Sequence, residues 1–332
     1  MFARLIIVSI LSIAFYAGSG FTAVIAQDAG IREPGAIVGT TGLNIRECPD
    51  VTCASVGLAQ LQDPVIITGP EEEGFVPVEW AGKAGWAWGL YVSSASRGTP
   101  YLVTGLPGCK RVAILFNIGI GQEMQMHTLR WLKQNKVPAT IFPMGWWALQ
   151  NQDDMREMAM LGFPIGTHGD TRMVLTEHSD NDVLNDLQSS ASNIKQVIGT
   201  DPVPYFTPYA AAIDDRVRSL VASKGYLPVA WDVSAADWDV DITADFVYER
   251  VVPNVVDGSI VEFHLDGPSS AQSTAVAIPW IVENLRDKGF TFVTVQDMAQ
   301  PCAAATPVPA DTGPMSNRAT PRAAAGTPTT ES

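Results

Sequence analysis

Hydrophobic and polar positions follow different patterns in different parts of the chain. Residues 36–93 alternate short apolar runs with turn residues, which predicts a small all-β domain. Residues 94–100 are rich in Ser, Gly and Pro, which predicts a linker. Residues 101–302 alternate strand-length apolar runs with longer segments whose apolar residues are three and four positions apart. The chain is therefore predicted to hold two folded domains, the second built of strand–helix units.

The second domain is predicted to be an α/β domain around a parallel sheet, closed into a barrel or open. Its strands are expected at residues 111–116, 139–142, 163–165, 204–206, 227–230, 259–263 and 290–293. Helices are expected between the strands, for example at residues 124–133, 182–197, 215–224 and 275–285. In parallel α/β barrels the reactive groups lie at the carboxyl ends of the strands, so those ends are the places to look for chemistry.

The two ends of the chain follow neither pattern. Arg4 precedes an apolar run, and Ala26 provides a small residue for cleavage, so residues 1–26 are predicted to be a signal peptide. An uncleaved membrane anchor is the alternative, which the Gly and Ser residues at 18–20 disfavour. Residues 303–332 are dominated by Ala, Thr and Pro, which predicts a disordered tail, with a glycosylated or wall-spanning stalk as the alternative.

Charge narrows the choice of partners. The formal net charge of -14 becomes -15 when Arg4 leaves with the signal peptide. This acidity argues against nucleic acid as a partner. A glycan partner would be held by stacking and hydrogen bonds rather than by charge. No membrane span is expected after signal cleavage, and the location indicated is secreted or cell envelope.

An even number of cysteines in an exported chain favours disulfides. Cys48 with Cys53 would close a local loop, and Cys109 with Cys302 would bracket the second domain. Four free thiols or a metal site are the alternatives.

Five segments at the predicted strand ends carry a family resemblance. They are residues 117–119, 168–172, 207–209, 231–238 and 264–266. In this order and at these places they resemble the five motifs of the polysaccharide deacetylase (NodB-homology) family. The resemblance implies a distorted (β/α) barrel of about seven strands and, in active members, metal-dependent removal of acetyl groups from N-acetylated sugars.

The sequence departs from this family at the reactive positions. Asn117 and Ile118 stand where the family has its catalytic base and a metal-binding Asp. His168 matches one metal-binding His, but Arg172 replaces the other, and Phe206 replaces an Arg that pairs with the base. A hydrolytic metal needs about three protein ligands and an open position. The prediction is a pseudoenzyme with no metal cofactor and with the base side of its site dismantled.

The acid side of the site is retained. His264 matches the family's general acid, and Asp237 matches the carboxylate that orients it; the alternative is a hydrogen-bonded pair without a catalytic role. Tyr209 and Trp238 are candidate substrate-binding residues. Glu262 is unexpected inside a barrel strand, and either faces the barrel mouth or pairs with the Arg at the second motif.

A rebuilt metal site is the alternative to a lost one. Asp170, Asp232 and Asp266 could converge with the two motif histidines and bind zinc or another divalent metal.

The first domain resembles bacterial SH3-like (SH3b) domains. The resemblance is carried by Leu-Asn-Ile-Arg-Glu-Cys-Pro at residues 43–49, by Gly-Trp-Ala-Trp at residues 85–88 and by Tyr-Val at residues 91–92. It implies a small SH3-like barrel that attaches an envelope protein to peptidoglycan. One of Trp86 and Trp88 is expected to face the core and the other the solvent, where it could stack on a ligand; the alternative is that both are buried.

Three functional hypotheses follow. The leading one is an exported cell-envelope protein that binds glycan or peptidoglycan with impaired or no deacetylase activity. The second is an active carbohydrate deacetylase with an atypical site. The third is a protein-interaction scaffold.

Overall fold

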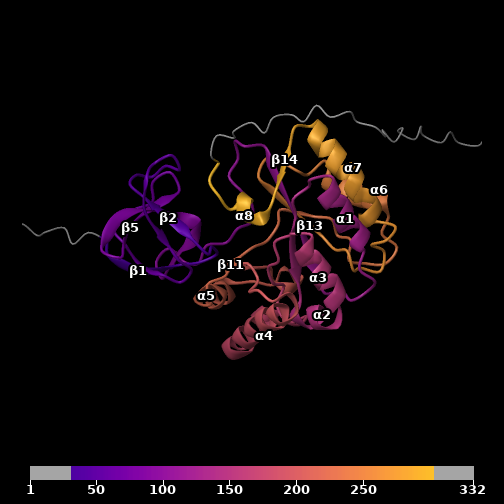
Figure 1. The fold of residues 1–332 in the computed structure, drawn as a ribbon, viewed down its shortest axis with the longest axis horizontal. Coiled ribbons are helices and arrows are strands. Elements are labelled where there is room, and N and C mark those ends of the chain that lie inside the picture. Colours follow the sequence, from indigo (N-terminus) through magenta and orange to yellow (C-terminus); the bar gives the residue numbers. More distant parts are fainter. Residues whose placement is uncertain (1–30, 303–332) are drawn as a thin grey trace, which may run out of the picture.

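The structure, a computed structural model, describes residues 31–302 and contains two domains joined by a short connection (Figure 1). The predicted signal peptide and the predicted tail lie outside the described residues. Within residues 31–302, no helix is long and apolar enough to cross a membrane.

The first domain is a single antiparallel sheet of seven strands in the order β3-β2-β6-β5-β4-β1-β7. The strands are β1 (Glu33–Ile37), β2 (Leu43–Arg46), β3 (Ser55–Ala59), β4 (Pro64–Ile67), β5 (Phe75–Trp80), β6 (Lys83–Trp88) and β7 (Val92–Ser94). The 3-10 turn η1 (Gly89–Tyr91) precedes β7. The all-β prediction is confirmed, and the strands reach slightly beyond the expected boundaries at both ends.

The expectation for the two tryptophans of β6 was wrong. Residues two apart in a strand lie on the same face, so Trp86 and Trp88 cannot alternate between core and solvent. Trp88 is buried, and its Nε1 donates a hydrogen bond to the Ala299 carbonyl of the second domain at 2.9 Å. Trp86 is half-buried and packs against the same core.

The second domain alternates strands and helices. Its strands are β8 (Arg111–Ile118), β9 (Thr140–Pro143), β10 (Tyr205–Phe206), β11 (Leu227–Pro228), β12 (Val233–Ser234), β13 (Ser259–Phe263) and β14 (Thr291–Val293). Its α-helices are α1 (Met126–Gln134), α2 (Gly145–Gln150), α3 (Gln152–Met160), α4 (Asp180–Ile198), α5 (Asp215–Ser223), α6 (Ala244–Val251), α7 (Thr274–Asp287) and α8 (Val295–Met298). Short 3-10 turns lie at Leu175–Glu177 (η2) and Tyr209–Ala211 (η3).

The strands of the second domain run parallel around an incomplete ring. β8 pairs with β13, β14 and β9, and β13 pairs with β12. The bridges Ile141↔Ile165 and Thr167↔Phe206 continue the ring toward the β10–β11 pair. The strand expected at 163–165 is thus only a bridge, and β12 was not predicted. In Figure 1, α1, α6 and α7 lie on one side of this ring, and α2 to α5 lie on another.

Side chains of β8 and β13 alternate between two environments. Val112, Ile114, Phe116 and Ile118 of β8 belong to the core between strands and helices. Ala113 and Leu115 point the other way and, with Ile260 of β13, belong to the core shared with the first domain. Asn117 follows on the inward row of β8, and Glu262 and His264 follow on the inward row of β13. The inward rows therefore change from apolar to polar toward the carboxyl ends of the strands.

The two domains share one continuous apolar core. Polar contacts add to it: the Tyr91 and Tyr205 hydroxyls are 3.0 Å apart, and Gln300 Nε2 donates to the Tyr91 hydroxyl at 2.7 Å. The backbones approach closely at Gly39, which adopts a φ of +70° and would bring a Cβ to 2.5 Å from the Leu227 Cβ. The first domain is thus packed against the second rather than tethered to it.

Both predicted disulfides are present. Cys48 pairs with Cys53 within the first domain, and Cys109 pairs with Cys302 across the second. The second bond joins the segment before β8 to the segment after α8, and that second segment carries the Ala299 carbonyl bonded to Trp88.

Candidate functional site

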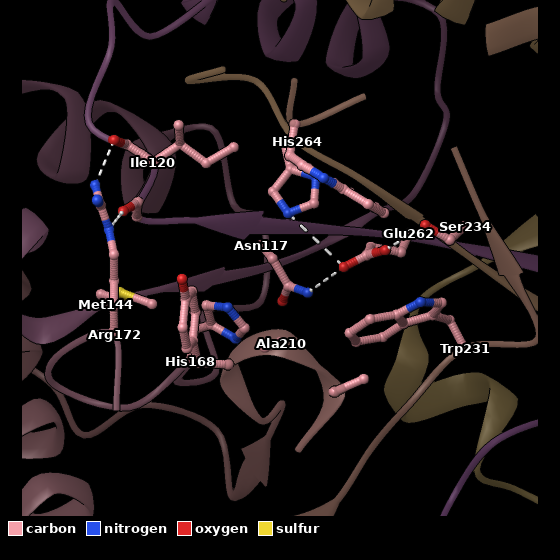
Figure 2. Close-up of a pocket in the computed structure, with 14 residues that line it drawn as sticks. Asn117, Ile120, Met144, His168, Arg172, Ala210, Trp231, Ser234, Glu262 and His264 are labelled. Carbon is pink, nitrogen blue, oxygen red and sulfur yellow. Dashed lines mark hydrogen bonds and ion pairs between the residues drawn. The ribbon is translucent and has the colours of Figure 1, made fainter. Parts of the chain in front are cut away.

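A pocket of about 550 Å³ opens at the carboxyl ends of the second domain's strands. The residues that line it include Asn117, His168, Arg172, Tyr209, Glu262 and His264, most of them labelled in Figure 2. Trp231 and Trp238 complete the aromatic part of the wall. The structure therefore gathers the predicted site residues into one cavity, with Asp237 buried directly behind it.

The residues that replace the family's base and metal ligand lie on opposite faces of β8. Asn117 faces the pocket and is buried, whereas Ile118 is fully buried among the apolar side chains that face the helices. Because β8 continues regularly through Ile118, strand alternation turns this side chain away from the pocket. Phe206 is likewise packed in an apolar cluster on the outer side of β10.

His264 and Asp237 form a buried hydrogen-bonded pair. His264 Nδ1 lies 2.9 Å from Asp237 Oδ1, and the backbone N–H of His264 donates to Asp237 Oδ2 at 3.0 Å. The Thr274 hydroxyl donates to the same Asp237 oxygen. Burial disfavours the His264 cation, but the hydrogen bond and charge of Asp237, with Glu262 and Asp266, outweigh it and raise the pKa of His264 to about 9. His264 is therefore an imidazolium at neutral pH.

Glu262 faces the pocket, which is one of the two placements expected for it from the sequence. Its Oε1 accepts a hydrogen bond from Asn117 Nδ2 at 2.9 Å, and its Oε2 accepts one from Ser234 Oγ at 2.7 Å. His264 Nε2 lies 3.7 Å from Oε1, as Figure 2 shows. Burial raises the pKa of Glu262, and these neighbours oppose that rise. The strand period of two accounts for this direction, because Glu262 is on the same face as His264.

The proposed pairing of Glu262 with Arg172 was wrong. Arg172 instead donates from Nε to the Gly119 carbonyl at 2.9 Å and from its terminal nitrogen to the Ile120 carbonyl. Its guanidinium also lies 5.7 Å from the centre of the Trp146 ring. Arg172 thus places a cation at the pocket rim and is held there by backbone carbonyls.

His168 is held as a neutral base in the pocket wall. Its Nδ1 lies 2.9 Å from the Thr207 hydroxyl, and that hydroxyl donates to Asn117 Oδ1 at 2.8 Å. Burial and the nearby His264 cation lower the pKa of His168 to about 3. A hydrogen-bonded chain therefore runs from His168 through Thr207 and Asn117 to Glu262.

The carboxylates proposed for a rebuilt metal site do not converge. Asp232 accepts from the Ser259 hydroxyl and the Ile260 backbone at the opposite end of β13, so its inclusion was wrong. Asp170 accepts from Asn193, and Asp266 is buried beneath the loop of residues 119–121. Among residues 31–302, no group of three or more His, Cys, Asp or Glu side chains is arranged to hold a metal.

For the divalent metal that the family resemblance implies, the residues at the ligand positions do not fit. Ile118 has no donor atom and is turned into the core, and Arg172 brings a positive charge. His168 alone retains a ligand type suited to such a metal. What the pocket can do without one is donate and accept protons or hydrogen bonds at His264 and Glu262 and stack sugar rings on its aromatic wall.

Two aromatic side chains flank the two histidines. The Tyr209 and His168 rings pack edge to face with their centroids 6.3 Å apart, and the Trp238 and His264 rings do so with their centroids 5.9 Å apart. Trp238 is 48% exposed, which leaves much of its indole available to a ligand. Trp231 lines the same pocket, although only its position within a motif, not its role, was noted in the sequence.

Residues 105–229 match the polysaccharide deacetylase family. The matching residues lie within the second domain, which is similar to polysaccharide deacetylases over that range. The peptidoglycan-N-acetylglucosamine deacetylase PgdA of Listeria monocytogenes is 27% identical over 190 residues, which is 57% of this chain and 39% of PgdA. A peptidoglycan-N-acetylglucosamine deacetylase of Bacillus cereus is 26% identical over 200 residues, 60% of this chain and 72% of that protein. The chain therefore spans less than half the length of PgdA.

Solved structures are similar to this chain in fold. The Bc1960 peptidoglycan N-acetylglucosamine deacetylase is 25% identical, with a TM-score of 0.57 over 61% of this chain and 94% of its own. BA3943 of Bacillus anthracis, described as a CE4 family pseudoenzyme, is 17% identical, with a TM-score of 0.58 over 79% of this chain and 92% of its own. At that identity the second likeness concerns the fold alone.

Proposed function

We propose that this chain is an exported cell-envelope protein that binds glycan strands, peptidoglycan among them, with little or no deacetylase activity. The peptidoglycan deacetylases among its relatives support the class of ligand. The pocket supports binding, because its aromatic wall and convergent polar groups suit a sugar.

The loss of hydrolysis is supported by where three of the four replaced positions lie. Asn117 is hydrogen-bonded into the pocket floor and cannot serve as a carboxylate base. Ile118 is in the core, and Arg172 is fixed at the rim as a cation. A metal-activated water requires about three protein ligands, and among the family's ligand positions only His168 supplies one.

We also propose that the first domain is an SH3-like module that takes part in wall binding. Its packing against the second domain supports a fixed arrangement in which both domains meet the same polymer. Trp88 is buried in the domain interface, so other side chains of the module would contact a ligand.

A second candidate function is an atypical hydrolase. The observation that favours it is the His264–Asp237 pair beside Glu262, a set of groups able to transfer protons. Under this alternative the retained pair would act without the usual ligand set.

The test combines binding, metal content and chemistry on the purified mature protein. Pull-down on purified peptidoglycan, with the full chain and with His264→Ala and Trp238→Ala variants, measures binding. Metal analysis and acetate release from N-acetylated chitooligosaccharides and peptidoglycan measure hydrolysis. Binding that weakens in Trp238→Ala without acetate release supports the proposal. Stoichiometric zinc with acetate release that disappears in His264→Ala supports the second candidate, and absence of any binding favours a protein-interaction scaffold.

A further inference from the structure

The charged residues that line the pocket are Glu262, His264 and Arg172. Glu262 Oε1 lies 3.7 Å from His264 Nε2, within ion-pair distance, so these two charges offset each other. The buried carboxylates Asp237 and Asp266 also act on the His264 ring. The acidic groups of this region are therefore gathered around His264, and Arg172 is the lining charge that they leave over.

Arg172 lies on a different side of the pocket. Figure 2 shows it beside Ile120 and Met144, across the pocket from Glu262. Its Nε and one terminal nitrogen donate to the carbonyls of Gly119 and Ile120, which are neutral acceptors. Within the described part of the chain, no ion pair joins Arg172 to a carboxylate. Arg172 is thus a cation whose charge is not matched by a direct partner in that part of the chain.

The loop that holds Arg172 is itself fixed by a buried carboxylate. Asp266 Oδ2 accepts hydrogen bonds from the backbone N–H groups of Gly119 and Gly121, at 3.0 and 2.8 Å. Gly121 has a φ of +86°, which glycine adopts without strain. The Trp146 ring, 5.7 Å from the guanidinium, restrains it further. A side chain that is already held in place loses less conformational entropy when a ligand binds.

An exposed guanidinium at a pocket rim suits the carboxylate of a ligand. Arg172 is exposed, and neither of its two hydrogen bonds uses Nη1. Hydrogen bonds between a guanidinium and a carboxylate are charge-assisted and stronger than those between neutral groups. The chain as a whole repels anions, because its formal net charge is -14. A preference for an anionic sugar would therefore have to come from groups at the pocket.

We propose that the pocket selects sugars that carry a carboxylate, with Arg172 donating to that carboxylate at the rim. This inference rests on the proposed glycan-binding function and specifies its ligand. Tyr209 and Trp238 would stack on the sugar ring while Arg172 contacts its charged group. The carboxylate belongs either to the ring itself, as in a uronic acid, or to a substituent, as in the lactyl ether of muramic acid.

The test compares two pairs of sugars by NMR chemical-shift titration of the full mature chain at neutral pH. N-acetylmuramic acid is paired with N-acetylglucosamine, and glucuronic acid is paired with glucose, so the members of a pair differ only at the position that carries the carboxylate. Because Arg172 is exposed to solvent, we expect the acidic member of at least one pair to bind about fivefold more tightly. Arg172→Gln should remove that preference and leave the binding of the neutral member.

Arg156→Gln is the matched control. Arg156 is an exposed arginine of α3 that pairs with Asp153 and does not line the pocket. The control removes the same charge from the chain and should keep the full preference in the same buffer. Thermal unfolding of each variant verifies that it is folded. Arg172→Lys is the second variant if Arg172→Gln does not fold, and it should keep only part of the preference because it loses the planar donor group.

The outcomes separate this inference from the proposed function. Equal binding within both pairs overturns the inference and leaves glycan binding standing. A preference that is unchanged in the Arg172 variants, or that disappears equally in Arg156→Gln, also overturns it. A preference in the first pair alone supports the inference and assigns the lactyl carboxylate, and one in the second pair alone supports it and assigns the ring carboxylate. Absence of binding to all the probes contradicts the inference and counts against the proposed function as well.

Discussion

Replacing Asp237 by Asn should lower the pKa of His264 and remove its charge at neutral pH. Asp237 is fully buried and holds the imidazole through a 2.9 Å contact between Asp237 Oδ1 and His264 Nδ1. Asn has nearly the same shape and can still accept from the His264 backbone, but it carries no negative charge. The substitution therefore removes both the charge and the acceptor that face His264 Nδ1, because the amide turns its NH2 group toward this nitrogen.

The magnitude follows from the balance of causes at His264. Burial opposes its cation, and the pKa nevertheless rises from 6.5 to about 9 because of Asp237 first and of Glu262 and Asp266 next. Without Asp237, burial is opposed only by the two remaining carboxylates, so the pKa should fall to near 6.5 or below. The difference corresponds to about 3 kcal/mol of stabilisation of the imidazolium.

The assay is an NMR titration of the histidine side chains, with the His264 signal assigned by its absence in His264→Ala. In the wild type, His264 should titrate near pH 9, and in Asp237→Asn it should titrate near or below 6.5. The matched control Asp239→Asn removes an exposed carboxylate next to Trp238, and its His264 should titrate as in the wild type. A His264 signal that titrates near 6.5 in the wild type would show that Asp237 does not stabilise the imidazolium. So would one that stays near 9 after the substitution.

The same pair should make stability depend on pH. The folded pKa of His264 lies above its unfolded value, so the pair's contribution is fully present below pH 6.5 and is lost as the pH rises through about 9. The free energy of unfolding, measured with urea across this pH range, should decline by up to about 3 kcal/mol in the wild type. The decline should be nearly absent in Asp237→Asn.

Other predictions concern the domain interface, the buried base and the core-facing strand. Gly39→Ala should destabilise the protein by about 2 kcal/mol more than Gly82→Ala in urea unfolding, because both have positive φ but only Gly39 meets Leu227; equal losses would contradict a tight interface. The free energy of unfolding should fall by up to about 5 kcal/mol as the pH drops from 6.5 to about 3, because His168 takes up a proton in the unfolded chain while it stays neutral in the folded one. His168→Gln should make this fall shallower, and an unchanged fall in the variant would contradict the prediction. Ile118→Asp should lower the unfolding free energy by about 3 kcal/mol or more, since it buries a carboxylate in the core, and no loss would contradict the outward direction of Ile118.

Patterns that depend on local periodicity predicted most of the second domain. β13 was predicted with its observed bounds because it is a short apolar run ended by a polar site. α4 was predicted within two residues at each end, and its N-cap Ser179 and left-handed C-cap Gly199 account for its length. The segment at 163–165 was wrong because it forms one bridge instead of a ladder. β12, only two residues long, offered no periodicity to detect.

The candidate site was predictable in identity more than in geometry. The five motif segments indicated which residues meet, and the structure places His168, Tyr209, Trp238 and His264 around one pocket. The direction of each side chain depends on where a strand ends. β8 continues through residue 118, which a sequence pattern could not fix, and this sends one replaced position into the core.

The domain interface could not be predicted, because it depends on side chains far apart in the sequence. Trp88 meets Ala299, and Tyr91 meets Tyr205 and Gln300. These contacts join the antiparallel sheet of the first domain to the parallel strands of the second, between residues more than 100 positions apart in the sequence. Nothing in the local pattern of either segment indicates its partner.

The central claim is that the pocket binds glycan without removing its acetyl groups. The decisive assay is acetate release from tetra-N-acetylchitotetraose and from peptidoglycan, with excess zinc present and with His264→Ala protein as the background. We expect acetate no higher than that background while the same preparation binds the polymer. Acetate released catalytically by the wild type and abolished in His264→Ala would contradict it.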